Sequence, residues 1–192
     1  MISSSLIRRL LWALPLVFSL AFTACGPDAA PPTAAGSPPA SQTEPQAELA
    51  KAFDGSTTAL FELRTAEQFG QVKANADAVL TTGDDGLKIK VTGNDPVLFL
   101  PTFAAGKQFI LQVVIEASTQ TGMQLFYMLR DKPSYSEAHA PLVALAKGRN
   151  VVYFRINQPN VIDPVRLDPA YTPGDYRIES IVAREIARPA TQ

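Results

Sequence analysis

The chain has 192 residues, in which 17 lysines and arginines nearly balance 18 aspartates and glutamates, so its formal net charge is −1 at pH 7. It has no cluster of basic residues, which excludes the electrostatic footprint of a protein that binds nucleic acid or anionic lipid headgroups. It contains one cysteine and one histidine, which excludes a disulfide within the chain and a histidine-rich metal site.

The first 24 residues have the pattern of a signal peptide. Arg8 and Arg9 precede an apolar run over residues 10–21. Because this run is shorter than the roughly 20 residues that a spanning helix needs, we predict a removable signal peptide over residues 1–24. Its removal takes away both arginines and changes the formal charge from −1 to −3.

The predicted cleavage site is Phe22-Thr23-Ala24-Cys25. A general signal peptidase requires small residues at −3 and −1, whereas Phe22 at −3 is bulky. The site instead resembles a bacterial lipobox, which implies that Cys25 becomes the N-terminus and carries acyl chains such as palmitate that bind the lipid bilayer. Gly26 after the cysteine favours, by enterobacterial analogy, the outer membrane with the domain facing the periplasm. The alternatives are an ordinary secreted protein and an uncleaved anchor in which Cys25 has no role.

Residues 25–52 are predicted to form a disordered tether. After Cys25 the segment is dominated by Pro, Ala, Ser and Thr and has almost no large apolar side chain. Such a segment cannot bury enough surface to offset the entropy of ordering, and its prolines keep it extended. Only a short helical turn at residues 46–52 is expected.

Residues 53–187 have the period of two that is typical of β-strands. Leu87, Ile89 and Val91 alternate with lysines, and residues 109–116 form a longer alternating run. Further predicted strands, separated by turn sequences rich in Gly, Pro, Asn and Asp, cover residues 58–63, 96–100, 123–129, 142–145, 150–156, 160–167 and 175–186. One helical turn is expected at 65–69. The sequence therefore predicts an all-β domain, an antiparallel β-sandwich of the jelly-roll type over residues 53–187, followed by a tail of residues 188–192.

A series of short motifs runs in a fixed order through residues 57–185: Thr92-Gly93-Asn94-Asp95-Pro96, Gln124-Leu125-Phe126-Tyr127, Tyr135-Ser136-Glu137, Gly148-Arg149-Asn150-Val151, Arg166-Leu167-Asp168-Pro169 and Pro173-Gly174-Asp175-Tyr176. The series resembles the β-sandwich modules appended to bacterial membrane glycosyltransferases and rhamnan-synthesis proteins of the cell envelope. Those modules are similar to galactose-binding-like, carbohydrate-binding jelly-rolls. The resemblance implies a non-catalytic accessory domain in surface polysaccharide biology.

Four residues within a short span of chain have side chains suited to holding a sugar: Gln124, Tyr127, Tyr135 and Glu137. Aromatic faces stack on the CH groups of a sugar ring, while amide and carboxylate groups bond its hydroxyls. The alternative interpretation is that both tyrosines are core or edge residues with one satisfied hydroxyl.

Arg166 and Asp168 are also candidate ligand-binding residues. They are two residues apart in a predicted strand and therefore share one face of it. The alternative is that the two charged side chains support the fold, either by pairing with a neighbouring strand or by holding a loop in place.

The sequence contains no recognisable catalytic motif. His139 is the sole histidine, and neither a Gly-x-Ser-x-Gly elbow nor a phosphate-binding glycine-rich loop occurs. We therefore predict a protein that is not an enzyme and needs no cofactor. The alternative is a hydrolase, because glycoside hydrolysis needs only two carboxylates several ångströms apart, and counting acidic residues does not exclude such a pair. Jelly-rolls often hold a structural Ca²⁺, but no spacing of acidic residues marks such a site here.

Together these patterns predict a lipid-anchored lipoprotein of the bacterial cell envelope with a polysaccharide as its partner. The alternative is a structural or protein-interaction module that docks on an envelope protein such as a membrane glycosyltransferase.

Overall fold

The structure is a computed structural model that describes residues 44–186. The predicted signal peptide, Cys25, most of the predicted tether and the predicted tail at 188–192 lie outside the described residues.

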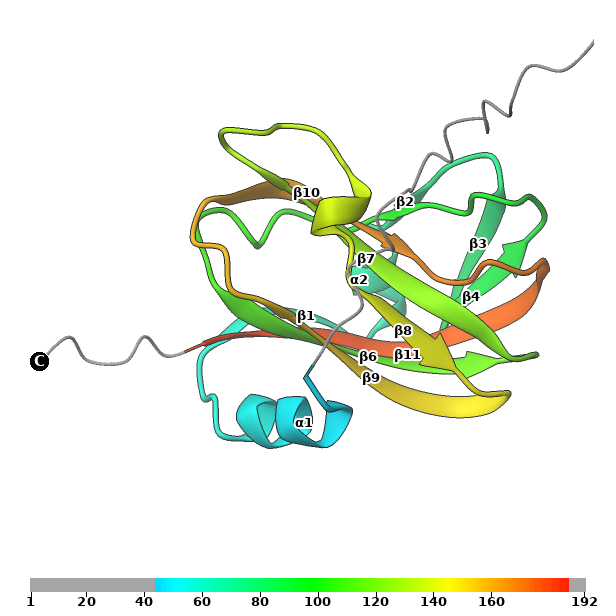
Figure 1. Ribbon diagram of the computed structural model, residues 1–192. Helices are drawn as coiled ribbons and strands as arrows, with labels where there is room; N and C mark the ends of the chain where they lie inside the picture. Colours follow the sequence, from blue (N-terminus) through cyan, green and yellow to red (C-terminus); the bar gives the residue numbers. More distant parts are fainter. Residues whose placement is uncertain (1–43, 187–192) are drawn as a thin grey trace, which may run out of the picture. The chain divides into compact units, whose positions relative to one another are not determined.

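The described residues form a sandwich of two antiparallel β-sheets (Figure 1). The six-stranded sheet has the order β3 (Ala78–Gly83), β4 (Gly86–Val91), β11 (Gly174–Glu185), β6 (Phe109–Ala117) and β9 (Gly148–Ile156), and β1 (Ala59–Leu63) also pairs with β11. The five-stranded sheet has the order β2 (Lys73–Ala74), β5 (Leu98–Phe99), β10 (Val161–Asp168), β7 (Thr121–Leu129) and β8 (Leu142–Leu145). This architecture confirms the predicted antiparallel β-sandwich of the jelly-roll class.

The inner faces of the two sheets share one hydrophobic core. Leu111, Val113 and Ile115 alternate along β6 and are completely buried, in the same cluster as Leu125 of β7 and Leu167 of β10. Successive side chains of a strand point to opposite faces. The residues that alternate with these core residues therefore form the outer surface of each sheet.

Part of the outer face of the six-stranded sheet is covered by helix α1 (Gln46–Asp54). Two of its apolar side chains, four residues apart on one side of the helix, form a second buried cluster with residues of β6, β9 and β11: Leu49, Phe53, Ile110, Tyr153 and Val182. The side-chain amide of Gln46 donates to the carbonyl oxygen of Tyr153 at 3.0 Å and accepts from its backbone N–H at 2.8 Å. The helix is therefore fixed to the edge strand β9.

Helix α1 extends the folded body into the segment that the sequence assigned to the tether. The expected short turn at 46–52 is a nine-residue helix that ends at Asp54. The small and charged residues between Leu49 and Phe53 suit a solvated tether as well as a helix, so composition alone did not separate the two.

Strands β1, β4 and β6–β11 lie where the sequence predicted strands, while the strand expected at 96–100 is reduced to β5. Helix α2 (Ala66–Phe69), with a capping box between Thr65 and Gln68, confirms the helical turn expected at 65–69. Strands β2 and β3 were missed. Strand β2 has only two residues, which is too short to show an alternating pattern. In β3, three apolar residues are followed by two threonines, so polar and apolar residues do not alternate.

Candidate functional site

A cleft of about 520 Å³ lies on the outer face of the five-stranded sheet. It is bounded by β7, β10, the β4–β5 loop, the β7–β8 connection and the segment after β10, and we call it the sheet cleft. It is lined by Asn94, Asp95, Gln124, Phe126, Tyr135, Ser136, Glu137, Arg166, Asp168 and Tyr171.

The floor of the sheet cleft is set by the register of two strands. In the ladder of β7 and β10, Phe126 lies opposite Arg166 and Gln124 lies opposite Asp168. The intervening Leu125 points into the core. Four outward side chains from two strands therefore come together, although their positions are some forty residues apart in the sequence.

Arg166 is held by two carboxylates. Its Nε and Nη2 donate to the two oxygens of Asp168, each at 2.7 Å, and Nη2 also donates to Asp95 at 2.8 Å. Its guanidinium lies 4.7 Å above the centroid of the Phe126 ring. The hydrogen bond to Asp168 raises the pKa of Arg166, so the guanidinium stays charged. The ion pair between Arg166 and Asp95 joins strand β10 to the β4–β5 loop.

Gln124 joins the floor of the cleft to its walls. Although it is buried, its Nε2 donates to Glu137 at 2.8 Å and to the carbonyl oxygen of Ala140 at 3.0 Å, and its Oε1 accepts from the hydroxyl of Tyr171 at 2.6 Å. Burial, followed by the charges of Asp168 and Glu137, raises the pKa of Tyr171 to about 12. The phenol is therefore neutral at physiological pH and remains a donor.

Two tyrosine rings border the sheet cleft. Tyr171 is 43% exposed, whereas Tyr135 is half-buried and its hydroxyl donates to the carbonyl oxygen of Pro164 at 2.8 Å. Tyr171 packs closely on Gly122, where a Cβ atom would lie 2.8 Å from its ring. Sequence reasoning missed Tyr171; its signal is an aromatic residue directly after the strand that carries Arg166 and Asp168.

The structure brings five of the sequence-predicted ligand residues into the sheet cleft: Gln124, Tyr135, Glu137, Arg166 and Asp168. It places the sixth, Tyr127, in the core, with its ring centroid 5.4 Å from that of His139. Tyr127 is three residues from Gln124 on the same strand, and an odd separation directs two side chains to opposite faces.

The sheet cleft offers acceptors and one cationic donor to a ligand. One oxygen of Glu137, one oxygen of Asp95 and Nη1 of Arg166 make no hydrogen bond to another residue within 44–186. In the same part of the chain, no group of three or more His, Cys, Asp or Glu side chains is placed to hold a metal ion. The arrangement is suited to hydrogen bonding beside an aromatic face.

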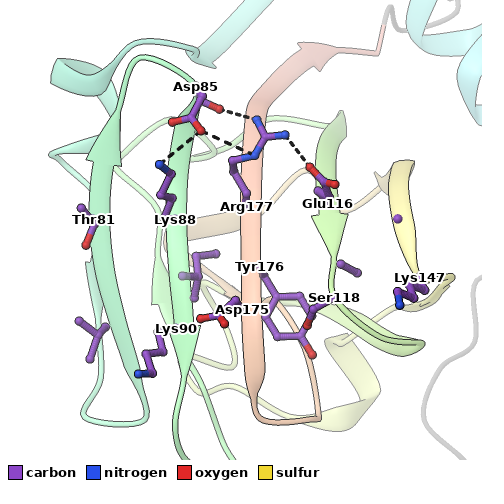
Figure 2. A pocket seen from close by; sticks show the side chains of 14 residues that line it. Thr81, Asp85, Lys88, Lys90, Glu116, Ser118, Lys147, Asp175, Tyr176 and Arg177 are labelled. Atoms are coloured by element: carbon purple, nitrogen blue, oxygen red, sulfur yellow. Dashed lines mark hydrogen bonds and ion pairs between the residues drawn. The ribbon is translucent and has the colours of Figure 1, made fainter.

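A larger cavity of about 670 Å³ lies on the outer face of the six-stranded sheet (Figure 2). Many of its charged groups bond one another: Arg177 lies 2.6 Å from Glu116, and Lys88 lies 3.4 Å from Asp85. The aromatic residue in its described lining, Tyr176, is buried. Because it lacks an accessible ring, this cavity is a weaker candidate than the sheet cleft for a ligand that stacks.

Neither a family model nor a curated protein matches the chain. Solved structures do resemble it. The apo CBM1 module of BiXyn10A has a TM-score of 0.50 at 12% identity, with 67% of this chain and 99% of that chain covered. A tyrosine-to-alanine mutant of CBM29-2, a family 29 carbohydrate-binding module, has a TM-score of 0.51 at 10% identity, with 69% and 94% covered.

A third similar structure contains the CBM22-1 and GH10 modules of endo-1,4-β-D-xylanase 10B from Clostridium thermocellum, complexed with xylohexaose. It has a TM-score of 0.54 at 8% identity, and the match covers 70% of this chain but only 30% of the xylanase chain. At these identities the likeness concerns the fold alone. The chain shares the jelly-roll β-sandwich of these modules.

Proposed function

We propose that this protein is a carbohydrate-binding accessory protein and that its glycan ligand occupies the sheet cleft. The observation that carries the proposal is the exposed ring of Tyr171 beside Glu137, Asp95 and Arg166, which present open hydrogen-bonding atoms. A sugar ring has both an apolar face of CH groups and a rim of hydroxyls, so it matches a flat aromatic surface flanked by polar groups.

The rigidity of the sheet cleft supports the same role. Its side chains stand on two paired strands and are fixed by the bonds of Gln124 and of Arg166 with Asp168. Because these side chains are already ordered, binding loses little free energy to the ordering of the protein. The volume of about 520 Å³ lies within the common range of roughly 300–1,000 Å³ for ligand pockets.

The comparisons add support from the printed descriptions of the similar structures. The CBM29-2 structure is described as a family 29 carbohydrate-binding module. The xylanase structure is described as a complex with xylohexaose.

The role is proposed to be non-catalytic. The carboxylate of Asp168 is engaged at both oxygens by Arg166, which leaves it unsuited to proton transfer. The only histidine, His139, lies beside the ring of Tyr127 rather than in the lining of the sheet cleft.

We further propose that acyl chains on Cys25 attach the protein to the outer membrane and that the domain faces the periplasm. The support is the lipobox-like segment Phe22-Thr23-Ala24-Cys25. Within residues 44–186, the structure has no helix with the length and apolarity needed to cross a membrane.

Replacement of Tyr171 by alanine tests the glycan-binding role. A glycan array first identifies the best ligand for the wild-type chain. Titration calorimetry with that glycan is then expected to show that Tyr171→Ala weakens binding about tenfold, equivalent to about 1.4 kcal/mol, because the stacking surface is removed.

Two variants serve as controls for this test. Tyr171→Phe keeps the ring and loses only the bond to Gln124, so it is expected to retain most of the affinity. Val151→Ala changes an exposed residue of β9 on the other sheet and is expected to bind as the wild type does. A blank array for the wild-type chain, or unchanged affinity in Tyr171→Ala, would contradict the proposal.

A further inference from the structure

The sheet cleft carries a net negative charge. Its lining contains one cation, the guanidinium of Arg166, and three carboxylates, those of Asp95, Glu137 and Asp168. The formal charge of the lining is therefore −2. Arg166 is already paired with two of these carboxylates, at 2.7 Å from Asp168 and 2.8 Å from Asp95. This pairing leaves little net attraction for an acidic ligand, so the cleft as a whole favours a cation.

Glu137 is the carboxylate of the lining without a cationic partner. One of its oxygens accepts a hydrogen bond from the neutral amide of Gln124 at 2.8 Å, and within residues 44–186 it forms no ion pair. Glu137 is exposed in the free protein, where water solvates its charge. A ligand that covers this carboxylate displaces that water, which costs free energy unless the ligand brings a compensating charge.

The open hydrogen-bonding atoms near Glu137 are mainly acceptors. The second oxygen of Glu137 and one oxygen of Asp95 accept no hydrogen bond from another residue in the described part of the chain. The hydroxyl of Tyr171 donates to Gln124, and its lone pairs remain as acceptors. A protonated amine has three donors and no acceptor, whereas a sugar hydroxyl has one donor. The amine therefore matches these acceptors better than a hydroxyl does.

The exposed ring of Tyr171 also suits a cation. The side-chain amide of Gln124 bonds both Tyr171 and Glu137, so the ring and the carboxylate are joined through one residue. Burial raises the pKa of Tyr171, and the charges of Asp168 and Glu137 raise it further, which reflects a negative potential at this ring. Ammonium groups are attracted to the face of an aromatic ring as well as to a carboxylate.

We propose that the glycan in the sheet cleft carries a protonated primary amine, as an amino sugar without an acetyl group does, and that this amine pairs with Glu137. This ligand class rests on the glycan-binding function proposed above. An amino sugar keeps the CH face that stacks on Tyr171, and its charge compensates the carboxylate that loses its water. Acidic sugars are expected to be excluded, because their carboxylates would meet Asp95 and Glu137.

A glycan array with matched ligands tests this preference on the wild-type chain. It includes short β-1,4-linked oligomers of glucosamine, N-acetylglucosamine, glucose and glucuronate. The best ligand is expected to carry a free amine, and acetylation of that amine is expected to weaken binding about tenfold in titration calorimetry. A best ligand that has no amine but still depends on Tyr171, or an affinity that acetylation leaves unchanged, would overturn the amine preference and leave the glycan-binding role standing. A blank array would overturn both.

Replacement of Glu137 by glutamine gives an independent readout. Glu137→Gln removes the charge but can still accept the hydrogen bond from Gln124. It is expected to weaken binding of the amine-bearing glycan about tenfold more than binding of its acetylated form, so that the preference is lost. Glu67→Gln, at an exposed position of helix α2 outside the lining, removes the same charge and is expected to keep the preference. Equal weakening of both forms in Glu137→Gln would overturn the proposal.

Discussion

Replacing Arg166 by alanine is expected to lower the free energy of unfolding by about 3 kcal/mol, since removal of one partner of a buried ion pair leaves an uncompensated charge. The charge in question is Asp168, which is 4% exposed. This decrease in stability is at the low end of the range for breaking a buried ion pair, because the Arg166 side chain is itself 18% exposed. Urea unfolding at pH 7, followed by far-UV circular dichroism, measures the change.

Arg177 provides the matched control. It also contacts several carboxylates, Asp85, Glu116 and Glu179 among them, but it lies on the open outer face of the six-stranded sheet, where Asp85 and Glu116 are about half exposed (Figure 2). Exposed ion pairs contribute at most about 1 kcal/mol, so Arg177→Ala is expected to cost no more than that. Equal costs for the two arginine variants would contradict the assignment of Arg166 and Asp168 as a buried pair.

A double variant separates the buried charge from the loss of packing. If the uncompensated carboxylate causes the destabilisation, Arg166→Ala combined with Asp168→Asn is expected to be more stable than Arg166→Ala alone. If the cost comes from lost contact between the guanidinium and Phe126, the second substitution will not restore stability.

Replacing Cys25 by alanine is expected to release the protein from membranes. Several acyl chains bury enough CH₂ groups to hold a protein stably on a bilayer, whereas a single chain is marginal. Without the acylated sulfur, the mildly acidic chain has no basic cluster to bind anionic lipid instead. Membrane fractionation after a high-salt wash, together with the mass of the N-terminal peptide, measures the effect.

Ser41→Ala in the predicted tether serves as the control for Cys25→Ala and is expected to stay with the membrane fraction. Retention of Cys25→Ala in that fraction, together with an N-terminal peptide of the wild type that carries no acyl mass, would remove the proposed lipid anchor.

The alternation of apolar and polar residues was sufficient to predict the sandwich. In β4, Leu87, Ile89 and Val91 face the core while the lysines between them face solvent, so a local pattern and the final burial agree. Strand β7 is nearly all apolar, and its pattern therefore does not reveal which residues point outward. That ambiguity is why Gln124 and Tyr127, which face opposite sides, appeared to belong to one site.

Parts of the structure that depend on distant contacts were harder to predict. Tyr171 belongs to the sheet cleft because its hydroxyl bonds Gln124 and its ring rests on Gly122, neither of which is near it in sequence. Helix α1 is recognisable only through Leu49 and Phe53, and their burial depends on the sheet beneath them. Tertiary packing stabilises most short helices in proteins more than propensity does.

Chemical-shift mapping by NMR tests whether a glycan binds in the sheet cleft. The wild-type chain is titrated with the glycan that binds best on the array while the backbone amides of residues 44–186 are followed. The largest shifts are expected around Gln124, Glu137 and Tyr171. Shifts concentrated instead on β3, β4 and β11, over the cavity of the six-stranded sheet, would contradict binding in the sheet cleft.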